Sequence, residues 1–496
     1  MSDPMPDLVN LRENRRFHQM LRALGDPLSE IIYRVKAASR GWSVRSRAEI
    51  RQPGHAMTTA DTSSDAPSPD ADASPADPQA QGYMPPAVSA PRYWLLISVL
   101  VLLACALAAG FAMRMLSEEA GTNSYAVLVD SWLSGQLHSD TCFDGDCATF
   151  EGKTYVIFPP APAAVALPFV ALSGQGADFK HFMPLSMALL LAIGFIWSRL
   201  FAAAGPDQTR TLILLLALVF ATPLYFVALR GDRVWFFAQL VGFFFVSMAL
   251  WATIERRNAW LAGIMIGMAF LSRQMSILYA PLLFALMLHD DEPLLRINKE
   301  RIAQALKLGV PILGAVGIYC LYNYVRFGAP LDTGYGYIAA NVLPGEENMI
   351  TLRINDLGLF AQEYFLFNVV HMFFQGLHID FGGTYTTKIM GVDSFGTSIL
   401  AASPFLLLLV FVQRHRIAFI GLATAAAICG ITLFYHSNGF SQYNVQRYAL
   451  DWLPIAMLLL APTVRTEWRG ILAVLVGYAM VLNLVTMAAL KISGTA

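Results

Sequence analysis

Charged residues are scarce in this chain of 496 residues: Asp, Glu, Lys and Arg make up 14% of it, and hydrophobic residues 56%. A soluble globular protein carries about 25% charged residues, so the shortage argues against a soluble domain. Runs of about 18 or more apolar residues recur along the sequence and predict a helical protein that crosses a membrane several times. The net charge is -1. Because the basic residues sit in short loops, where they act as topology signals, we expect no nucleic-acid partner.

An early apolar stretch is also missing, so no cleavable signal peptide is predicted. Cysteine is rare, with five residues. Three of them lie in apolar segments and are expected to be small buried hydrophobic residues; they are Cys105, Cys320 and Cys429. Cys142 and Cys147 flank an acidic turn, where a disulfide is expected if the loop is extracytoplasmic. A metal site is the alternative, but two thiols alone make a poor zinc site.

Composition divides the chain into three parts. Residues 1–51 are basic and have an apolar pattern compatible with an amphipathic helix, so we expect a cytoplasmic segment that either contacts the membrane surface or is solvated. Residues 52–91 are rich in Pro, Ala, Ser and Asp, which is typical of a disordered linker. The membrane domain is expected at residues 92–496.

Twelve apolar segments follow one another in this domain. They are 93–113, 157–173, 181–203, 209–229, 233–254, 259–272, 275–288, 305–325, 397–412, 416–435, 449–463 and 469–490. Segment 157–173 contains four prolines and is predicted to be re-entrant or interfacial. The expected fold is therefore an all-α polytopic membrane protein with about 11 (10–13) transmembrane helices. Basic clusters place the N-terminus in the cytoplasm and the loops 114–160 and 328–395 outside it, each with interfacial helices.

The loop at 114–160 gathers seven carboxylates and a single lysine, Lys153. A carboxylate in this loop could deprotonate an acceptor hydroxyl or hold a divalent cation. For any single residue, solvation of an outward loop is the favoured explanation, whereas the group as a whole favours a functional site. Residues 125–137 are typical of a short amphipathic helix that carries Asp130. Asp146 lies in a turn before an expected extended segment.

Arginines on the same membrane face are candidate phosphate ligands, because the guanidinium group offers forked donors. Arg230 and Arg233 flank Asp232 in a charged turn, which either marks the membrane interface or binds an anion. Arg273 has few neighbours in the sequence that would explain it structurally. We therefore regard Arg273 as a functional candidate.

The later outer segments offer further candidates. Arg447 either binds a phosphate or forms an ion pair with Asp451, four residues further along a helix. Aromatic and histidine side chains there either line a substrate groove or belong to an aromatic belt. His371, His378 and Asp380 have a spacing that is weakly compatible with a metal site. The candidate groove residues are Tyr155, His371, His378 and Tyr448.

The order of these features resembles the GT-C superfamily of integral membrane glycosyltransferases, near the bacterial aminoarabinose transferases and the protein O-mannosyltransferases. A first span is followed by an acidic loop and then by a proline pair. A second acidic turn precedes the stretches WLAGIMIGMAFLSRQ and NYVRFGAPLDTGY. The resemblance covers residues 93–460, and it implies that a sugar is transferred from a polyprenyl-phosphate or polyprenyl-diphosphate donor at the periplasmic face.

The resemblance also implies two acidic site residues. The family's first-loop Asp acts as base or metal ligand, and here its place is taken by Asn123. The remaining carboxylates that could serve are Glu118, Glu119, Asp130 and Asp146, of which Asp130 and Asp146 are favoured. Asp232 matches the second acidic position, so Asp130 and Asp232 would be the ligands of a divalent cation (Mg or Mn). Lys153 would substitute for a family lysine that stands where this chain has Phe158.

The predicted function is therefore that of a glycosyltransferase of the bacterial inner membrane, with an envelope glycan, lipid or protein as acceptor. The expected donor-phosphate ligands are Lys153, Arg230, Arg233, Arg273 and Arg447. A flippase or transporter of lipid-linked sugars is the first alternative, but it would have two pseudosymmetric halves, and no internal repeat is visible. An O-antigen polymerase or ligase is the second alternative and would rely on Arg and His of loop 328–395.

Overall fold

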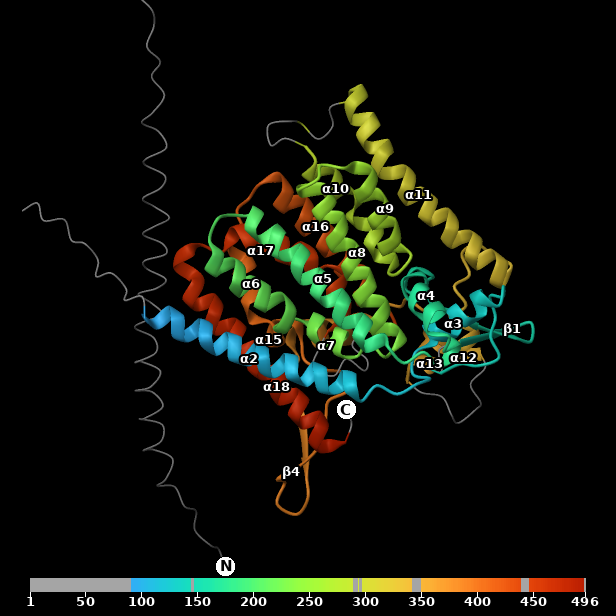
Figure 1. Ribbon diagram of the computed structural model, residues 1–496, viewed down its shortest axis with the longest axis horizontal. Coiled ribbons are helices and arrows are strands. Elements are labelled where there is room, and N and C mark those ends of the chain that lie inside the picture. Colours follow the sequence, from blue (N-terminus) through green and yellow to red (C-terminus); the bar gives the residue numbers. More distant parts are fainter. Residues whose placement is uncertain are drawn as a thin grey trace, which may run out of the picture. The chain divides into compact units, whose positions relative to one another are not determined.

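The computed structural model of the chain describes residues 91–143, 147–288, 293, 297–340, 349–438 and 446–494. The expectations for segments 1–51 and 52–90, and for Asp146, concern residues outside this part. The described chain is mostly helical (Figure 1), with two small two-stranded sheets. The predicted helical class is therefore confirmed.

Six helices of the described chain are long and apolar enough to cross a membrane. They are α2 (Pro91–Leu116), α5 (Phe182–Ala203), α8 (Val234–Ile254), α11 (Lys299–Phe327), α16 (Arg416–Leu433) and α18 (Arg469–Ser493). Helices α6 (Gln208–Phe220) and α7 (Pro223–Leu229) form a seventh candidate, bent by 49°. The expected count of about 11 is not confirmed, because the other apolar helices have 10–17 residues and a span needs about 20.

The shorter apolar segments correspond to stretches expected from hydropathy, except α14 with η3, which lies in loop 328–395, where an interfacial helix was expected. They are α4 (Ala161–Ser173), α9 (Ala259–Phe270), η2 (Gln274–Tyr279) with α10 (Ala280–Leu286), α14 (Tyr364–Val369) with η3 (Val370–Phe374), and α17 (Leu453–Thr463). The remaining short helices are α3 (Ser124–Leu133), η1 (Gly176–Asp178), α12 (Tyr335–Ala340), α13 (Met349–Leu357), α15 (Ile399–Ala402), η4 (Pro404–Phe411), η5 (Arg447–Asp451) and η6 (Thr466–Trp468). The short helix expected after the first span is confirmed as α3.

Local sequence explains several helix ends. Asn123 precedes α3, and its side chain accepts a hydrogen bond from the N–H of Tyr125, as N-cap residues do. The break between α6 and α7 falls at Thr222 and Pro223. Proline cannot donate the hydrogen bond that would continue α6, whereas it suits the first turn of a new helix. The Thr222 hydroxyl caps that new helix by accepting from the N–H of Leu224.

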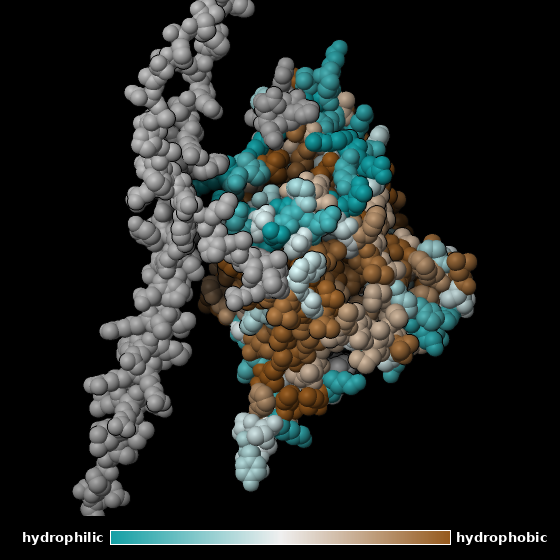
Figure 2. Space-filling view, turned by 60° about the vertical axis from the view of Figure 1, so that its left-hand side comes forward, coloured by the Kyte–Doolittle hydropathy of each residue, from teal (hydrophilic) through white to brown (hydrophobic). Residues whose placement is uncertain are grey.

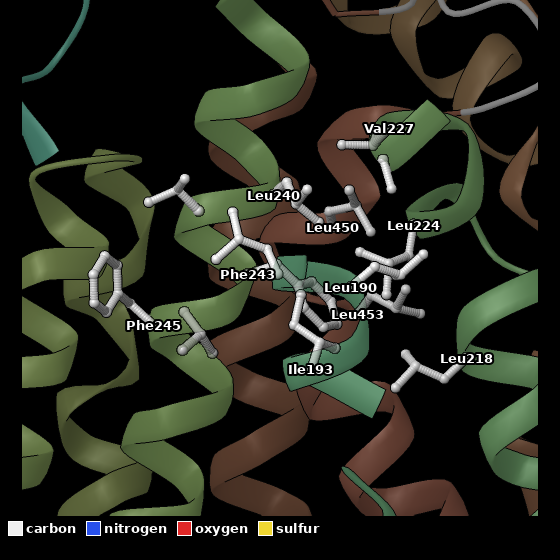
Figure 3. Packing of buried hydrophobic residues seen from close by; sticks show 14 of the residues in the cluster. Leu190, Ile193, Leu218, Leu224, Val227, Leu240, Phe243, Phe245, Leu450 and Leu453 are labelled. Atoms are coloured by element: carbon white, nitrogen blue, oxygen red, sulfur yellow. The ribbon is translucent and has the colours of Figure 1, made fainter. Parts of the chain in front are cut away.

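Helix α8 is the central helix of the described bundle. In its most apolar window 78% of the residues are buried, against 28% for α2 and 17% for α11. Figure 3 shows its side chains Leu240 and Phe243 beside Leu190 of α5, and beside Leu224 and Leu453 from α7 and α17. The chain therefore surrounds α8 with other helices and leaves α2 and α11 at the periphery.

The peripheral helices expose large apolar side chains. Leu102 of α2 and Leu313 of α11 are 68% and 70% exposed, and Figure 2 shows hydrophobic residues covering a broad part of one face, with hydrophilic residues above and below. An exposed apolar surface of this size indicates a protein embedded in a membrane. The expectation that Cys105 is buried is wrong. This side chain is exposed, because it lies on the face of α2 that points away from the bundle.

Two hairpins interrupt the helical fold. Strands β1 (Cys147–Phe150) and β2 (Lys153–Val156) are antiparallel, and the turn residues Glu151 and Gly152 both have positive φ, as a type I′ turn requires. A disulfide joins Cys142 to Cys147 at the start of β1, which confirms the predicted bridge. Strands β3 (Ile379–Gly382) and β4 (Lys388–Val392) form the second hairpin, and β4 packs against α18.

We expect replacement of both bridged cysteines by serine to loosen the first hairpin selectively. The bridge closes a loop of only a few residues, for which chain entropy gives about 2 kcal/mol. Amide hydrogen exchange of residues 147–156 should therefore accelerate by about tenfold or more, while exchange in α8 stays unchanged. Equal exchange of the hairpin in both proteins would contradict a structural role for the bridge.

Candidate functional site

Asp232 lies in the tight turn between α7 and α8 and is only 1% exposed. At Gly231 the turn packs closely against α5 and against Asn123, which precedes α3. A Cβ atom at this position would collide with the side chain of Ser186 on α5. The carbonyl of Gly231 also accepts a hydrogen bond of 3.2 Å from the side-chain amide of Asn123. Helices α3 and α5 therefore fix the position of the buried carboxylate.

Three arginines surround this carboxylate. Nη2 of Arg114, in the last turn of α2, lies 2.6 Å from Oδ2 of Asp232. Nε of Arg230 lies 3.8 Å from Oδ1, and Nε of Arg233 lies 4.0 Å from Oδ2. Burial of a carboxylate requires such compensation. Because three guanidinium groups face one carboxylate, the cluster keeps a surplus of positive charge.

Glu118 is a second carboxylate at the same place, just after α2. Its Oε1 and Oε2 accept hydrogen bonds of 2.8 and 2.9 Å from the N–H groups of Phe182 and Met183. The carboxylate thus caps the N-terminus of α5, where the preceding residue, His181, makes no side-chain cap hydrogen bond. We refer to Arg114, Glu118, Arg230, Asp232 and Arg233 as the Asp232 cluster.

Burial raises the pKa of Glu118 from 4.5 to about 7, and the negative charge of Asp232 acts in the same direction. The two backbone hydrogen bonds and Arg114 oppose the shift. Since the pKa is higher in the folded protein than in the unfolded chain, protonation of Glu118 favours folding. The stabilisation of the folded state by Glu118 protonation is therefore complete below about pH 4.5 and is lost as the pH rises through about 7.

A second cluster of polar side chains lies further along α8, toward its C-terminal end. Arg273, in the break between α9 and η2, donates two hydrogen bonds to Asp451, with Nε to Oδ1 at 3.1 Å and Nη2 to Oδ2 at 2.7 Å. The Arg447 guanidinium lies over the ring of Tyr448 at 4.9 Å. The Tyr448 hydroxyl lies 2.6 Å from that of Ser437. We refer to Arg273, Ser437, Arg447, Tyr448 and Asp451 as the Arg273 cluster.

One face of α8 connects the two clusters. Asp232 is followed at helical spacing by Phe236, Gln239 and Gly242. The ring of Phe236 lies 5.6 Å from the Arg447 guanidinium, and the Gln239 amide donates a hydrogen bond of 2.8 Å to the Arg447 carbonyl. A Cβ atom at Gly242 would lie 2.9 Å from Cγ of Arg273. At 1.5 Å per residue, this face extends over about 15 Å.

Several sequence-predicted site residues are thus brought together. Arg230 and Arg233 lie beside Asp232, whereas Arg273 lies in a second group with Arg447 and Tyr448. The predicted alternative of an ion pair between Arg447 and Asp451 is wrong, because Asp451 pairs with Arg273. Arg114 was not recognised in the sequence, where it only appeared to end the first apolar run.

The other predicted residues lie elsewhere. Lys153 is exposed at the start of β2, and Tyr155 is buried against Phe327 at 5.4 Å. The ring of His371 lies 4.2 Å from that of Phe367 and is tilted by 44° against it, and burial lowers the pKa of His371. His378 is 62% exposed at the base of the second hairpin. Among the described contacts, none joins these four residues to Asp232.

Asp130 does not join Asp232 either. It lies on α3 and borders a polar hollow of about 460 Å³ together with Asp178. The described residues contain no group of three or more His, Cys, Asp or Glu side chains suited to a metal ion. Asp232 itself is a poor ligand for a divalent cation, because three guanidinium groups surround it. The predicted pairing of Asp130 with Asp232 in a metal site is therefore not supported by their positions.

Comparison with known proteins identified no similar protein. No family model matches the chain, and neither the curated proteins nor the solved structures contain a match.

We expect Asp451→Asn to destabilise the protein by about 3 kcal/mol, because the substitution leaves the Arg273 guanidinium without its carboxylate partner among packed helices. Thermal unfolding of the purified protein in detergent measures this effect. Arg199→Gln is a matched control: it breaks an ion pair with Glu255 whose arginine is 58% exposed, and should cost less than about 1 kcal/mol. Equal losses in both variants would contradict a buried role for the pair.

Proposed function

We propose that this protein is an integral membrane glycosyltransferase that moves a sugar from a polyprenyl-phosphate or polyprenyl-diphosphate donor to an envelope acceptor. The observation that carries the proposal is the Asp232 cluster. It combines a carboxylate whose pKa is about 7 with a surplus of arginine at the ends of apolar helices. A base of that pKa and a cationic phosphate site are the two groups that such a transfer requires.

Glu118 would act as the general base. It takes the proton of an acceptor hydroxyl as that oxygen forms a bond to the anomeric carbon of the sugar. The bond from this carbon to the donor phosphate breaks, and its electron pair leaves with the phosphate. A base with a pKa near the working pH is the most effective, because it is deprotonated and still binds a proton well. The hydrogen bonds to Phe182 and Met183 would hold the carboxylate in place.

The arginines would stabilise the negative charge on the leaving phosphate. Arg230 and Arg233 were expected in this role, and Arg114 is added to them. Arg273 is less suited to it, since both of its forked donors already bind Asp451. Asp232 would orient the arginines. Its buried Oδ1 accepts no hydrogen bond within the described structure and could accept one from a sugar hydroxyl. No step of this scheme is assigned to a metal ion.

The membrane orientation belongs to the same proposal. Basic clusters between the apolar segments would face the cytoplasm, which puts the Asp232 cluster at the periplasmic side of a bacterial inner membrane. Donor and acceptor would then meet in the outer leaflet. The acceptor would be an envelope glycan, a lipid or a protein.

One observation favours a different candidate. Arg273 and Asp451 form an ion pair among packed helices, and transporters use paired ionisable residues within their membrane helices. A flippase for lipid-linked sugars would use this pair, and the sugar would cross the membrane without being released from its lipid. An O-antigen polymerase or ligase would instead depend on His371 and His378.

The direct test is an assay of purified protein in proteoliposomes with a panel of labelled polyprenyl-phosphate sugars. Release of free polyprenyl phosphate, dependent on an added envelope fraction, measures transfer. We expect Asp232→Asn and Glu118→Gln each to lower kcat by about 100-fold or more. Asp140→Asn changes an exposed carboxylate of the same loop and should retain the wild-type rate.

The outcomes separate the candidates. Full activity of both the Asp232 and the Glu118 variant would contradict the proposed site. Loss of activity in Asp130→Asn but not in Glu118→Gln would move the base to the residue favoured by sequence. Sugar that crosses the membrane still attached to its lipid would identify a flippase, and loss only on replacement of His371 or His378 would favour the polymerase or ligase.

The activity should also depend on pH through Glu118. Because the base must be deprotonated, kcat should rise with pH and reach half of its plateau at about pH 7. In the Glu118→Gln variant, the residual kcat should no longer rise with pH in this range. A rate that does not change between about pH 6 and 8 would exclude Glu118 as the base.

A further inference from the structure

Two hollows lie on either side of the C-terminal turn of α4. The first, of about 420 Å³, is apolar and lies between Phe169 and Leu172 of α4 and the first two turns of α5. The second, of about 460 Å³, is bordered by Asp130 of α3 and by the loop from Gly174 to Asp178. Helices α3 and α4 pack against each other (Figure 1), so the apolar and the polar hollow share the end of α4 as a wall.

The apolar hollow continues the exposed surface of a membrane helix. Pro184 and Ala188 line it, and the exposed stripe of α5 goes on at helical spacing to Leu191 and Phe195, which are 67% and 69% exposed. In a helix that spans the bilayer, these side chains face lipid tails. Because the hollow lies at the end of α5, it is placed where acyl chains meet headgroups.

The polar hollow is acidic. The Asp130 carboxylate lies against the backbone of Gly176, so closely that a Cβ atom there would be 2.6 Å from Oδ1, and Gly176 has a positive φ of 56°. Asp130 is half-buried and Asp178 is exposed, and within the described residues neither side chain forms an ion pair or a side-chain hydrogen bond. Lys180 and His181 follow in the same loop. The loop thus adds the carboxylate of Asp178 to that of Asp130 on α3, and its basic side chains Lys180 and His181 follow two and three residues later.

From this arrangement we infer a binding site for one zwitterionic, amine-bearing phospholipid. One acyl chain occupies the apolar hollow along α5. The ammonium group pairs with Asp130 and Asp178, and the phosphate faces Lys180 and His181. An anionic headgroup without an amine would place a hydroxyl or a negative charge beside the two carboxylates, and so would bind less tightly.

The site is connected to the Asp232 cluster through the start of α5. Glu118 binds the N–H groups of Phe182 and Met183, which directly follow the loop that forms both hollows. A lipid bound there would order the segment that Glu118 caps. The inference does not require glycosyl transfer, since it concerns lipid binding alone.

The test measures which lipids the full-length protein retains. Protein reconstituted with equal amounts of dioleoyl phosphatidylethanolamine and dioleoyl phosphatidylglycerol is extracted again into mild detergent, and the bound lipids are counted by native mass spectrometry. We expect phosphatidylethanolamine to be enriched about fivefold. The double variant Asp130→Asn/Asp178→Asn should lose this enrichment, and Asp140→Asn should keep it.

A second variant tests the apolar hollow. Ala188→Trp would fill it and should reduce the retention of both lipids, whereas Ala427→Trp, on the exposed face of α16, should not. Thermal unfolding checks that each variant is folded. Equal retention of the two lipids, enrichment of phosphatidylglycerol, or an enrichment that survives in the double aspartate variant would overturn the inference.

Discussion

The ion pair of Asp232 with Arg114 is the interaction on which the arrangement of the helices depends. A carboxylate that is 1% exposed must be neutralised where it lies, and Arg114 does this from the last turn of α2 at 2.6 Å. The adjacent Gly231 is held by Asn123 and leaves no space between the turn and Ser186. One buried charge therefore connects the first span and α3 to the start of the central helix, next to α5.

Helix α8 extends this constraint through the bundle. Most of its surface packs against leucine and phenylalanine, while one face carries Asp232, Phe236 and Gln239 toward the arginines of two clusters. A polar face is stable inside an apolar bundle only when its groups have partners. The charges that hold the helices together are thus also the ones available for chemistry. The surplus of positive charge distinguishes the Asp232 cluster from the Arg273 cluster, where the Asp451 carboxylate accepts two hydrogen bonds from Arg273.

The candidate site was predictable where its residues are neighbours in the chain. Arg230, Asp232 and Arg233 were recognised together because one turn holds them. An ion pair between Arg447 and Asp451 was one of two alternatives, and it assumed an α-helix, in which residues four apart share a face. The segment is instead the 3₁₀ helix η5, with three residues per turn, so this spacing does not apply.

Sequence by itself determined the class of the protein, the positions of its apolar segments and the bridge between Cys142 and Cys147. These properties follow from composition and from contacts within a few residues. Only the tertiary structure decided that Glu118 rather than Asp130 stands beside Asp232, and that Arg114 completes the cluster. Arg114 and Asp232 lie 118 residues apart in the chain, and Arg273 and Asp451 lie 178 residues apart. Their meeting depends on how whole helices pack, and hydropathy carries no information about that.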